Sequence, residues 1–411
     1  MRTQLNIGLF GFGCVGSGLH EVLNRSNLLN ARISKIVVKD KSKPRTLPVD
    51  SFAFDKSVIL DDPEINLVVE LINDPNAAWE IVSTALRSGK HVVSANKKLI
   101  AERLPELLQL SKENNVSFLY EAAVCGSIPI IRNLEEYYNN DSISSVDTIC
   151  NGTSNYILTK LTEEGRPFDE ILKSAQSAGF AEIDPTLDID GWDSKYKLQI
   201  LLRHAFGLST RPDQILNLGI RHIKPDDIRT GLEKGYRVRL VASARRFGDC
   251  IIAFVAPRFV KADSFAYDVN NEFNAVSIEG LFADKQLFKG KGAGSFPTAS
   301  AVLSDISALQ FNYRYEYRKS DAKVSLLDDF KVRVYISSTD RRLLNLIDFE
   351  SVEEEYRTDE FSYRVGTIRF SELNHDLYRS YPELFIAFVG DGLTDVEVIS
   401  NDKASILTEK E

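Results

Sequence analysis

The sequence predicts an α/β fold, in which a doubly wound parallel sheet is followed by an α+β domain and a small C-terminal α+β domain. Three observations support this prediction. A glycine-rich turn directly follows a strand-like run at the N-terminus, and strands alternate with helices up to about residue 130. Beyond that point the pattern changes, which indicates a second organisation. At 411 residues the chain is long enough for two or three domains, each with its own core.

The composition is that of a globular protein, with 43% hydrophobic and 27% charged residues. A net charge of −9 argues against nucleic acid as the main partner. No apolar run reaches membrane-spanning length, and the glycine turn comes too early for a signal peptide. The four cysteines have no CxxC spacing, which suits reduced thiols: Cys14, Cys125, Cys150 and Cys250. We therefore expect a cytoplasmic enzyme.

The first motif is a GxGxxG pattern between a strand and a helix. The strand-like run Leu5–Phe10 precedes Gly11, Gly13 and Gly16. Gly11 allows a tight turn, Gly13 lets the backbone approach a pyrophosphate, and Gly16 permits close packing of strand and helix. The phosphates then lie at the N-terminus of the helix. This context predicts a dinucleotide-binding Rossmann domain over residues 1–130.

The choice between NAD and NADP stays open. The second strand, "ISKIVVKD", ends at Asp40, where an acid commonly binds the ribose hydroxyls. Basic residues surround this acid, and they either hold a 2′-phosphate or belong to a solvated loop: Lys39, Lys41, Lys43 and Arg45.

The later strands of this domain carry polar residues at their carboxyl ends. Residues 65–74 are expected to contain a buried strand and residues 77–90 a helix, and "HVVSANKK" is a strand running into Asn96 and Lys97. A further strand ends near Glu121. Ligands bind at the carboxyl ends of strands in such sheets, so Lys97 is placed where a ligand lies.

The second domain is expected over residues 131–320, with a return of the chain to the first domain near 288–320 as a variant. A strand is followed by the polar turn Asn151–Asn155, which is either an N-cap alone or part of a site. The stretch "AEIDPTLDIDGWDSKYKL" (181–198) is either a solvated charged loop or a site, and Asp193 and Lys197 share one helix face within it. "FKGKGAGSFPTASAVLSDISAL" (288–309) adds a second glycine turn suited to an anion.

Taken together, these segments resemble homoserine dehydrogenases. The resemblance covers residues 4–315 and rests on an ordered set: "GLFGFGCVGSG", "SANKK", "YEAAVCGSIPI", "NGTSNYIL", "GFAEIDPTLDIDGWDSKYKL" and "GKGAGSFPTASAVLSD". It implies reversible reduction of L-aspartate 4-semialdehyde to L-homoserine with NADH or NADPH, in threonine and methionine biosynthesis. Because no kinase-like segment precedes the glycine turn, the monofunctional form is expected, as a homodimer or homotetramer without nucleic-acid or membrane partners.

The resemblance also assigns roles to residues. Hydride attack on the aldehyde carbon places negative charge on oxygen, and a nearby ammonium stabilises it and delivers the proton. Lys197 and Lys97 match the catalytic lysines, and Asp193 matches the acid that steadies the lysine and binds substrate. The implied substrate-binding residues are Glu182, Thr153, Gly152 and Asp188. The implied cofactor-binding residues are Gly11, Gly13, Val15, Gly16, Asp40, Arg45, Asn96, Lys97, Ala293, Gly294 and Thr298.

The family also binds a monovalent cation, sodium or potassium. The matching positions here are Glu121, Val124, Gly126 and Ile128. Cys125 in the same turn is interpreted as a small packing residue.

Four neighbours in the acidic stretch receive structural interpretations. Asp188 and Lys195 are better read as facing solvent, although Asp188 is kept in the substrate set. Asp184 shapes a turn, and Asp190 is expected to cap the helix that follows.

Two other functions are alternatives for this sequence. Another Rossmann dehydrogenase of amino-acid pathways, such as aspartate-semialdehyde dehydrogenase, needs a reactive cysteine and a histidine base, and no histidine is an obvious partner for Cys125. A dinucleotide-sensing protein without catalysis has no use for the two lysines and the two acids, Glu182 and Asp193.

Residues 328–411 are expected to form a divergent version of the ACT domain that long homoserine dehydrogenases carry. Three strands are predicted at 330–337, 361–370 and 384–390, and the charged run 348–356 is read as a helix. The ACT pattern has an Asp-x-Pro-Gly turn after its first strand, whereas this chain reads "SSTDRRLLNL". Without that glycine the amides are harder to present to a carboxylate. We therefore predict a structural or dimer-supporting tail with little or no inhibition by threonine.

Overall fold

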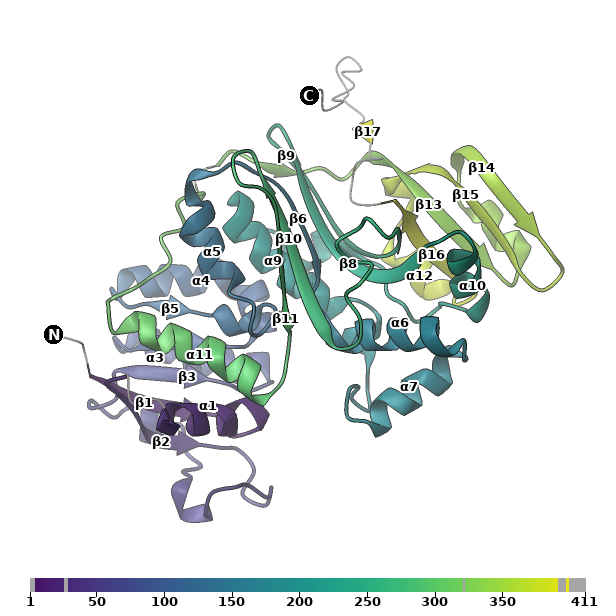
Figure 1. The fold of residues 1–411 in the computed structure, drawn as a ribbon. Coiled ribbons are helices and arrows are strands. Elements are labelled where there is room, and N and C mark those ends of the chain that lie inside the picture. The colour runs from purple at the N-terminus through teal and green to yellow at the C-terminus, as the bar shows by residue number, and fades with distance from the viewer. Residues whose placement is uncertain (1–3, 26–28, 321, 391–396, 399–411) are drawn as a thin grey trace. The chain divides into compact units, whose positions relative to one another are not determined.

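The computed structural model describes residues 4–25, 29–320, 322–390 and 397–398. They form two compact units, shown in Figure 1. One unit contains the chain up to Asn139 together with Gly290–Arg318, and the other contains Asn140–Lys289 and the chain from Lys319 onward. Across these described ranges, no helix is long and apolar enough to cross a membrane.

The first unit is built on a five-stranded parallel sheet with the strand order β2-β1-β3-β4-β5. Its strands are β1 (Leu5–Phe10), β2 (Ala31–Val37), β3 (Leu67–Glu70), β4 (His91–Ser94) and β5 (Phe118–Leu119). Its α-helices are α1 (Cys14–Arg25), α2 (Ser57–Leu60), α3 (Pro75–Arg87), α4 (Lys97–Glu113), α5 (Ile130–Glu135) and α11 (Ser295–Leu309). The central strands are almost wholly buried, as expected for a parallel sheet covered on both faces. The predicted doubly wound sheet is confirmed.

Helix α11 joins this unit although it comes late in the sequence. It packs along α1 in Figure 1, and the Ser295 hydroxyl donates a 2.8 Å hydrogen bond to the Cys14 carbonyl. A Cβ on Gly18 would collide with Ser295, so glycine at this position allows the two helices to approach.

The second unit contains a 12-stranded mixed sheet. Its main path is β11-β10-β6-β8-β9-β16-β13-β15-β14. The strands are β6 (Ile143–Ile149), β7 (Leu216–Asn217), β8 (Arg237–Phe247), β9 (Cys250–Val260), β10 (Phe273–Gly280), β11 (Asp284–Lys291), β12 (Ser325–Leu326), β13 (Phe330–Ser338), β14 (Phe349–Arg357), β15 (Ser362–Arg369), β16 (Leu384–Val389) and β17 (Glu397–Val398). The α-helices are α6 (Gly152–Glu164), α7 (Phe168–Ser177), α8 (Thr186–Ile189), α9 (Trp192–Phe206), α10 (Pro225–Glu233) and α12 (His375–Ser380).

The C-terminal segment has the strand order β16-β13-β15-β14, with all neighbours antiparallel. This is the order of a split βαβ, ferredoxin-like module. The module is not separate from the rest of the unit, because β16 pairs in parallel with β9 at Phe388 and Arg258. Its core is also shared, since Phe254 of β9 packs against Phe330 and Phe388. Residues 391–396 and 399–411 of the predicted C-terminal domain lie outside the described residues.

The helix predicted for residues 348–356 was wrong. This run is strand β14, which pairs with β15 at the edge of the sheet. Its glutamates form ion pairs with basic residues of β13 and β15: Glu350 with Lys331, Glu353 with Arg333, and Glu355 with Arg364. Cross-strand charge pairing therefore outweighs the helical propensity of the glutamates, and charges on an edge strand also discourage pairing with other chains.

Candidate active site

The first unit holds a cavity of about 990 Å³ at the carboxyl ends of β1, β2 and β3. Five of the predicted cofactor-binding residues line it: Gly11, Gly13, Val15, Asp40 and Arg45. Other lining residues include Phe10, Phe12, Lys39, Lys43, Leu71, Asn73 and Asp74. A cavity of this size with mostly apolar walls and a few charges is typical of a cofactor site.

The glycine turn forms part of the wall of this cavity. Gly11 has φ +92°, and a Cβ there would lie 2.6 Å from the Leu71 carbonyl oxygen. A Cβ on Gly16 would collide with the Gly11 carbonyl. At Gly13, in contrast, a Cβ would meet nothing within 4 Å, so this backbone faces open space. The open position is where a pyrophosphate approaches in such turns.

The basic loop after β2 supplies charge to the same cavity. The Asp40 carboxylate accepts hydrogen bonds from the Ser42 hydroxyl (2.7 Å) and amide (2.8 Å), which lower its pKa. The Arg45 guanidinium lies over the Phe52 ring at 5.2 Å. Its Nε is buried and has no hydrogen-bond partner among the described residues. Lys41 lies over Phe54 instead and does not line the cavity.

A buried acid lies at the ends of β3 and β4. The Glu70 carboxylate accepts hydrogen bonds from the Ser94 hydroxyl (2.6 Å) and the Ile72 amide (2.7 Å), and burial raises its pKa to about 7. Glu70 is not among the residues predicted from the sequence, although an acid at the end of the apolar run "LVVE" indicates such a site. The network continues into Asn96, whose Nδ2 donates to the Ile72 carbonyl at 3.1 Å.

The remaining predicted cofactor residues do not line the cavity. Asn96 is the N-cap of α4, and half-buried Lys97 is the first residue of that helix. Gly294 is the N-cap of α11 and accepts a hydrogen bond from the buried Thr298 amide (3.2 Å). Ala293 precedes it, so this second glycine turn lies beside the start of α1.

The predicted cation site is a turn in which the acid already has partners. The buried Glu121 carboxylate accepts hydrogen bonds from the Ile131 and Arg132 amides at 2.9 and 2.8 Å, capping α5. Burial, together with the charge of Asp305, raises its pKa to about 8. No group of three or more His, Cys, Asp or Glu side chains that could hold a metal was found in the described part of the chain. A cation here would therefore rely on backbone carbonyls, and Val124, Gly126 and Ile128 form the buried turn that offers them.

In the second unit, Lys197 and Asp193 form a buried ion pair on the first turns of α9. The Lys197 ammonium donates to the Asp193 carboxylate at 2.7 Å and to the Cys150 carbonyl at 2.6 Å. The exposed fractions of the two residues are 8% and 3%. Because water does not screen these two charges, their electrostatic attraction is stronger than that of an exposed ion pair.

Asn151 links this pair to the acidic stretch. Its Nδ2 donates to Asp193 at 2.9 Å and to Asp188 at 2.6 Å, and its Oδ1 accepts from the Ser154 amide at 2.7 Å. It is thus both the N-cap of α6 and a bridge between two carboxylates. The sequence left open whether this turn is an N-cap alone or part of a site, and it did not indicate the bridge between the carboxylates.

Two of the expectations for the acidic stretch were wrong. Asp188 is half-buried against Asn151, and Lys195 is fully buried rather than solvated. The Lys195 ammonium lies 3.9 Å from the Trp192 ring centre and donates to the Ile215 carbonyl at 3.1 Å. Burial lowers the pKa of Lys195 to about 7. Helix α9 is enclosed on almost every side, so it has no solvent face for a lysine.

The helix cap also differs from the prediction. Asp190 closes α8, and Gly191 with φ +79° is the N-cap of α9. Asp190 instead pairs with the Arg221 guanidinium at 2.8 Å. Asp184 accepts from the Thr186 amide at 3.1 Å, which is a turn-shaping contact.

The other substrate candidates lie around the start of α6. Thr153 donates its hydroxyl proton to the Phe180 carbonyl at 2.7 Å, and Gly152 is the first residue of the helix. Glu182 is exposed, and its carboxylate forms no hydrogen bond or ion pair with the residues that the structure describes. The structure therefore links Asp188, Asp193 and Lys197 in one hydrogen-bond network through Asn151, and Glu182 is not part of that network.

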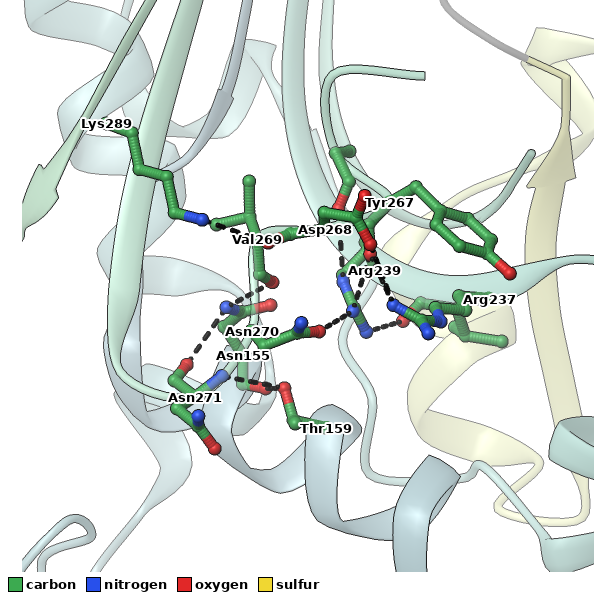
Figure 2. Close-up of polar contacts among 12 residues, drawn as sticks. Asn155, Thr159, Arg237, Arg239, Tyr267, Asp268, Val269, Asn270, Asn271 and Lys289 are labelled. Atoms are coloured by element: carbon green, nitrogen blue, oxygen red, sulfur yellow. Dashed lines mark hydrogen bonds and ion pairs between the residues drawn. The ribbon is translucent and has the colours of Figure 1, made fainter. Parts of the chain in front are cut away.

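The loop of residues 267–271 is bound to α6 and to β8 by side-chain hydrogen bonds. Figure 2 shows the Asn155 amide donating to the carbonyls of Val269 and Asn271, both at 2.9 Å. The buried Arg239 guanidinium donates to the Asn270 side chain at 2.7 Å and to the Tyr267 carbonyl at 3.0 Å. These side chains satisfy the carbonyls of a loop that would otherwise lack partners. Arg239 has no distinct sequence signal, because its strand β8 also contains Arg237, Arg245 and Arg246.

A glycine turn at a dinucleotide-sized cavity and a buried lysine held by an aspartate define an oxidoreductase that uses a nicotinamide dinucleotide. Two family models match the chain: "Homoserine dehydrogenase, NAD binding domain" over residues 11–121 and "Homoserine dehydrogenase" over residues 129–307. The chain belongs to the homoserine dehydrogenase family.

Individual relatives agree with this assignment. The homoserine dehydrogenase of Bacillus subtilis is 39% identical over 319 residues, covering 75% of this chain and 74% of that protein. That of Lactococcus lactis is 38% identical over 313 residues, covering 74% and 73%. The crystal structure from Thiobacillus denitrificans matches with a TM-score of 0.83 and 30% identity over 95% of this chain and all of that one. A hyperthermophilic archaeal homoserine dehydrogenase in complex with NADPH matches with a TM-score of 0.65 and 28% identity, covering 76% and 99%.

Proposed function

We propose that this chain catalyses the reversible reduction of L-aspartate 4-semialdehyde to L-homoserine with NADH or NADPH, in threonine and methionine biosynthesis. The observation that carries the proposal is the buried ammonium of Lys197, fixed by Asp193 and the Cys150 carbonyl. Membership of the homoserine dehydrogenase family supports it.

The lysine and its neighbours have distinct roles in this proposal. The bound nicotinamide supplies or accepts the hydride. The Lys197 ammonium stabilises the negative charge that develops on the aldehyde oxygen and provides the proton that completes the alcohol. Asp193 holds the ammonium in one orientation, and Asn151 holds Asp193 and Asp188. We assign Lys97, at the carboxyl end of β4, as the second catalytic lysine.

The substrate carries an ammonium and a carboxylate, and the second unit offers partners for both. Asp188, Asp193 and Glu182 are the acids proposed to bind the substrate ammonium. The amides of Gly152 and Thr153 lie at the N-terminus of α6, which favours a carboxylate.

We further infer that Lys39, Lys43 and Arg45 hold the 2′-phosphate of NADPH. All three line the cavity, and the buried Arg45 Nε has no partner among the described residues. Asp40 is less suited to ribose hydroxyls here, because its carboxylate is already closed into a turn with Ser42. A guanidinium with a spare donor fits a phosphate well.

We propose that the chain has three functional domains. Residues 1–130 bind the dinucleotide, residues 131–320 bind the substrate, and residues 328–411 form an ACT-like module. A sodium or potassium ion is proposed at the Val124–Ile128 turn, held by carbonyls.

We also propose a cytoplasmic homodimer or homotetramer. The hairpin of β10 and β11 exposes Leu281, Phe282 and Leu287 to 71%, 77% and 52%, and an exposed apolar patch of this kind suits association of copies. Light scattering on purified protein would measure the oligomeric state.

A steady-state assay tests the central proposal. Semialdehyde would be supplied with NADH and with NADPH in separate reactions. Turnover with either supports a dehydrogenase, whereas dinucleotide binding without turnover would favour the dinucleotide-sensing alternative.

A further inference from the structure

Helix α12 of the C-terminal segment packs against the start of the helix that carries Asp193 and Lys197. His375, the first residue of α12, stacks on Trp192, the first residue of α9. The two ring centres are 6.0 Å apart and the ring planes differ by 11°. The stack therefore ties the C-terminal module directly to the first turn of α9.

His375 makes a second contact on the other side of the helix cap. Its Nε2 lies 2.8 Å from the Asn217 Oδ1, and the Asn217 Nδ2 donates to the Asp190 carbonyl at 2.6 Å. One imidazole thus holds the residues on both sides of Gly191: Asp190 through Asn217, and Trp192 through the stack.

A small shift of the backbone at Gly191 would move the start of α9, and with it Asp193. Gly191 has φ +79° and is the N-cap of α9, so the direction of the helix is set there. Asp193 follows two residues later. A displacement of about 1 Å in a positioned catalytic group can cost up to roughly 100-fold in rate.

The rest of α12 supports the same segment. Tyr378 stacks on His222 with ring centres 4.5 Å apart, and its hydroxyl lies 2.8 Å from the position of a Cβ on Gly219. Arg221, between these residues, holds the Asp190 carboxylate. Helix α12 therefore also packs against residues 219–222, the segment whose Arg221 holds Asp190 just before α9.

We propose that His375 is a positioning residue for the reaction, which it serves by holding the Gly191 cap through Trp192 and Asn217. The inference rests on the proposed roles of Asp193 and Lys197. It gives the C-terminal module a task in catalysis that requires no bound effector.

The test compares three single variants. His375→Ala removes both contacts, His375→Phe keeps the stack, and Ser380→Ala changes an exposed residue at the end of the same helix. We expect His375→Ala to lower kcat roughly 10-fold with unchanged affinity for the dinucleotide. His375→Phe should recover part of that loss, and Ser380→Ala should match the wild type.

A double-mutant cycle with Trp192→Leu separates positioning from general destabilisation. If His375 acts through Trp192, adding His375→Ala to Trp192→Leu should change kcat little further, because coupled residues are not additive. In a Trp79→Phe background, Trp192 is the only tryptophan, and its fluorescence reports whether the stack is present in each folded variant.

Three outcomes would overturn the inference. They are a folded His375→Ala variant with kcat within twofold of wild type, additive effects in the cycle, and a His375→Phe variant that restores the stack by fluorescence but recovers none of the lost kcat. Failure of the proposed function looks different, because the wild type itself would then show no turnover with the semialdehyde.

Discussion

The Lys197 ammonium lies 2.7 Å from the carboxylate of Asp193, which precedes it by one helical turn, and both side chains are buried. A lysine held in this way presents its charge in one direction, because the carboxylate and the Cys150 carbonyl restrict its rotation. Such preorganisation is what makes a charged group effective in a transition state.

Replacing Lys197 with Ala should lower kcat about 100-fold or more, because the charge acts on an oxyanion that exists only in the transition state. The affinity for the dinucleotide, measured by fluorescence titration, should stay near that of the wild type. Lys173→Ala, an exposed lysine on α7, is the matched control. A Lys197→Ala variant that keeps a third of the activity would remove the lysine from the mechanism.

Lys97→Ala should lose turnover to a similar extent. This lysine begins α4 in the dinucleotide-binding unit, so we expect weaker dinucleotide binding in addition. Steady-state kinetics together with the titration distinguish the two lysines, and unchanged kcat would contradict the assignment.

Asn151→Leu should reduce both stability and activity. Loss of the cap on α6 costs about 1 kcal/mol in the free energy of unfolding. Loss of the bridge between Asp188 and Asp193 should lower kcat by roughly 10-fold beyond that, because the carboxylate that orients Lys197 loses its own support. Asp340→Ala removes a cap on an exposed 3-10 helix and should affect stability only. Equal kcat for the two variants would refute the bridging role.

Arg45→Ala should raise the KM for NADPH by roughly 10-fold and leave the KM for NADH nearly unchanged, because only NADPH carries the 2′-phosphate. Lys41→Ala is a control on the same loop, since Lys41 does not line the cavity. Equal effects of Arg45→Ala on both cofactors would return the cluster to a solvated loop.

The stack on Trp192 should make the protein sensitive to acid. Burial, with the positive charges of Lys195 and Arg379, lowers the pKa of His375 from 6.5 to about 4, and Asp376 opposes this only weakly. Between these values the unfolded chain binds more protons than the folded chain, so the contribution of His375 to stability rises with pH from 4 to 6.5.

The measurement is chemical unfolding of the wild type and His375→Phe at pH 4.5 and 6.5. The wild type should lose more stability than the variant on acidification. Parallel losses would show that the imidazole does not titrate as described.

Threonine at millimolar concentration should inhibit weakly or not at all. In the turn after β13, the Asp340 carboxylate accepts a hydrogen bond from the Arg342 amide at 3.0 Å. This amide is therefore already occupied and does not face the carboxylate of an added amino acid. The Arg342 side chain also pairs with the Asp340 carboxylate at 2.7 Å and lowers its pKa to about 2, so the two groups satisfy each other within the turn. Strong inhibition of the full chain by threonine in the steady-state assay would overturn this prediction.

The sequence by itself determined the elements whose signal is local. Gly11 and Gly16 have no room for a side chain, so the pattern around them predicted the turn, the sheet and the cofactor class. The spacing of Asp193 and Lys197 likewise placed both on one helix face, because that distance is fixed by helix geometry. Ordered motifs from several segments were enough for the family.

Only the tertiary structure decided what depends on distant partners. Lys195 is buried because α9 is enclosed by strands far away in sequence, and spacing along one helix carries no information about that. Residues 348–356 form a strand because β13 and β15 supply basic partners for the glutamates. Asn151, Arg239 and His375 gained their roles from hydrogen bonds that span 28 to 158 residues. Local propensity is worth a few tenths of a kcal/mol per residue, whereas burial and ion pairing across the fold are worth more, so the long-range contacts prevail.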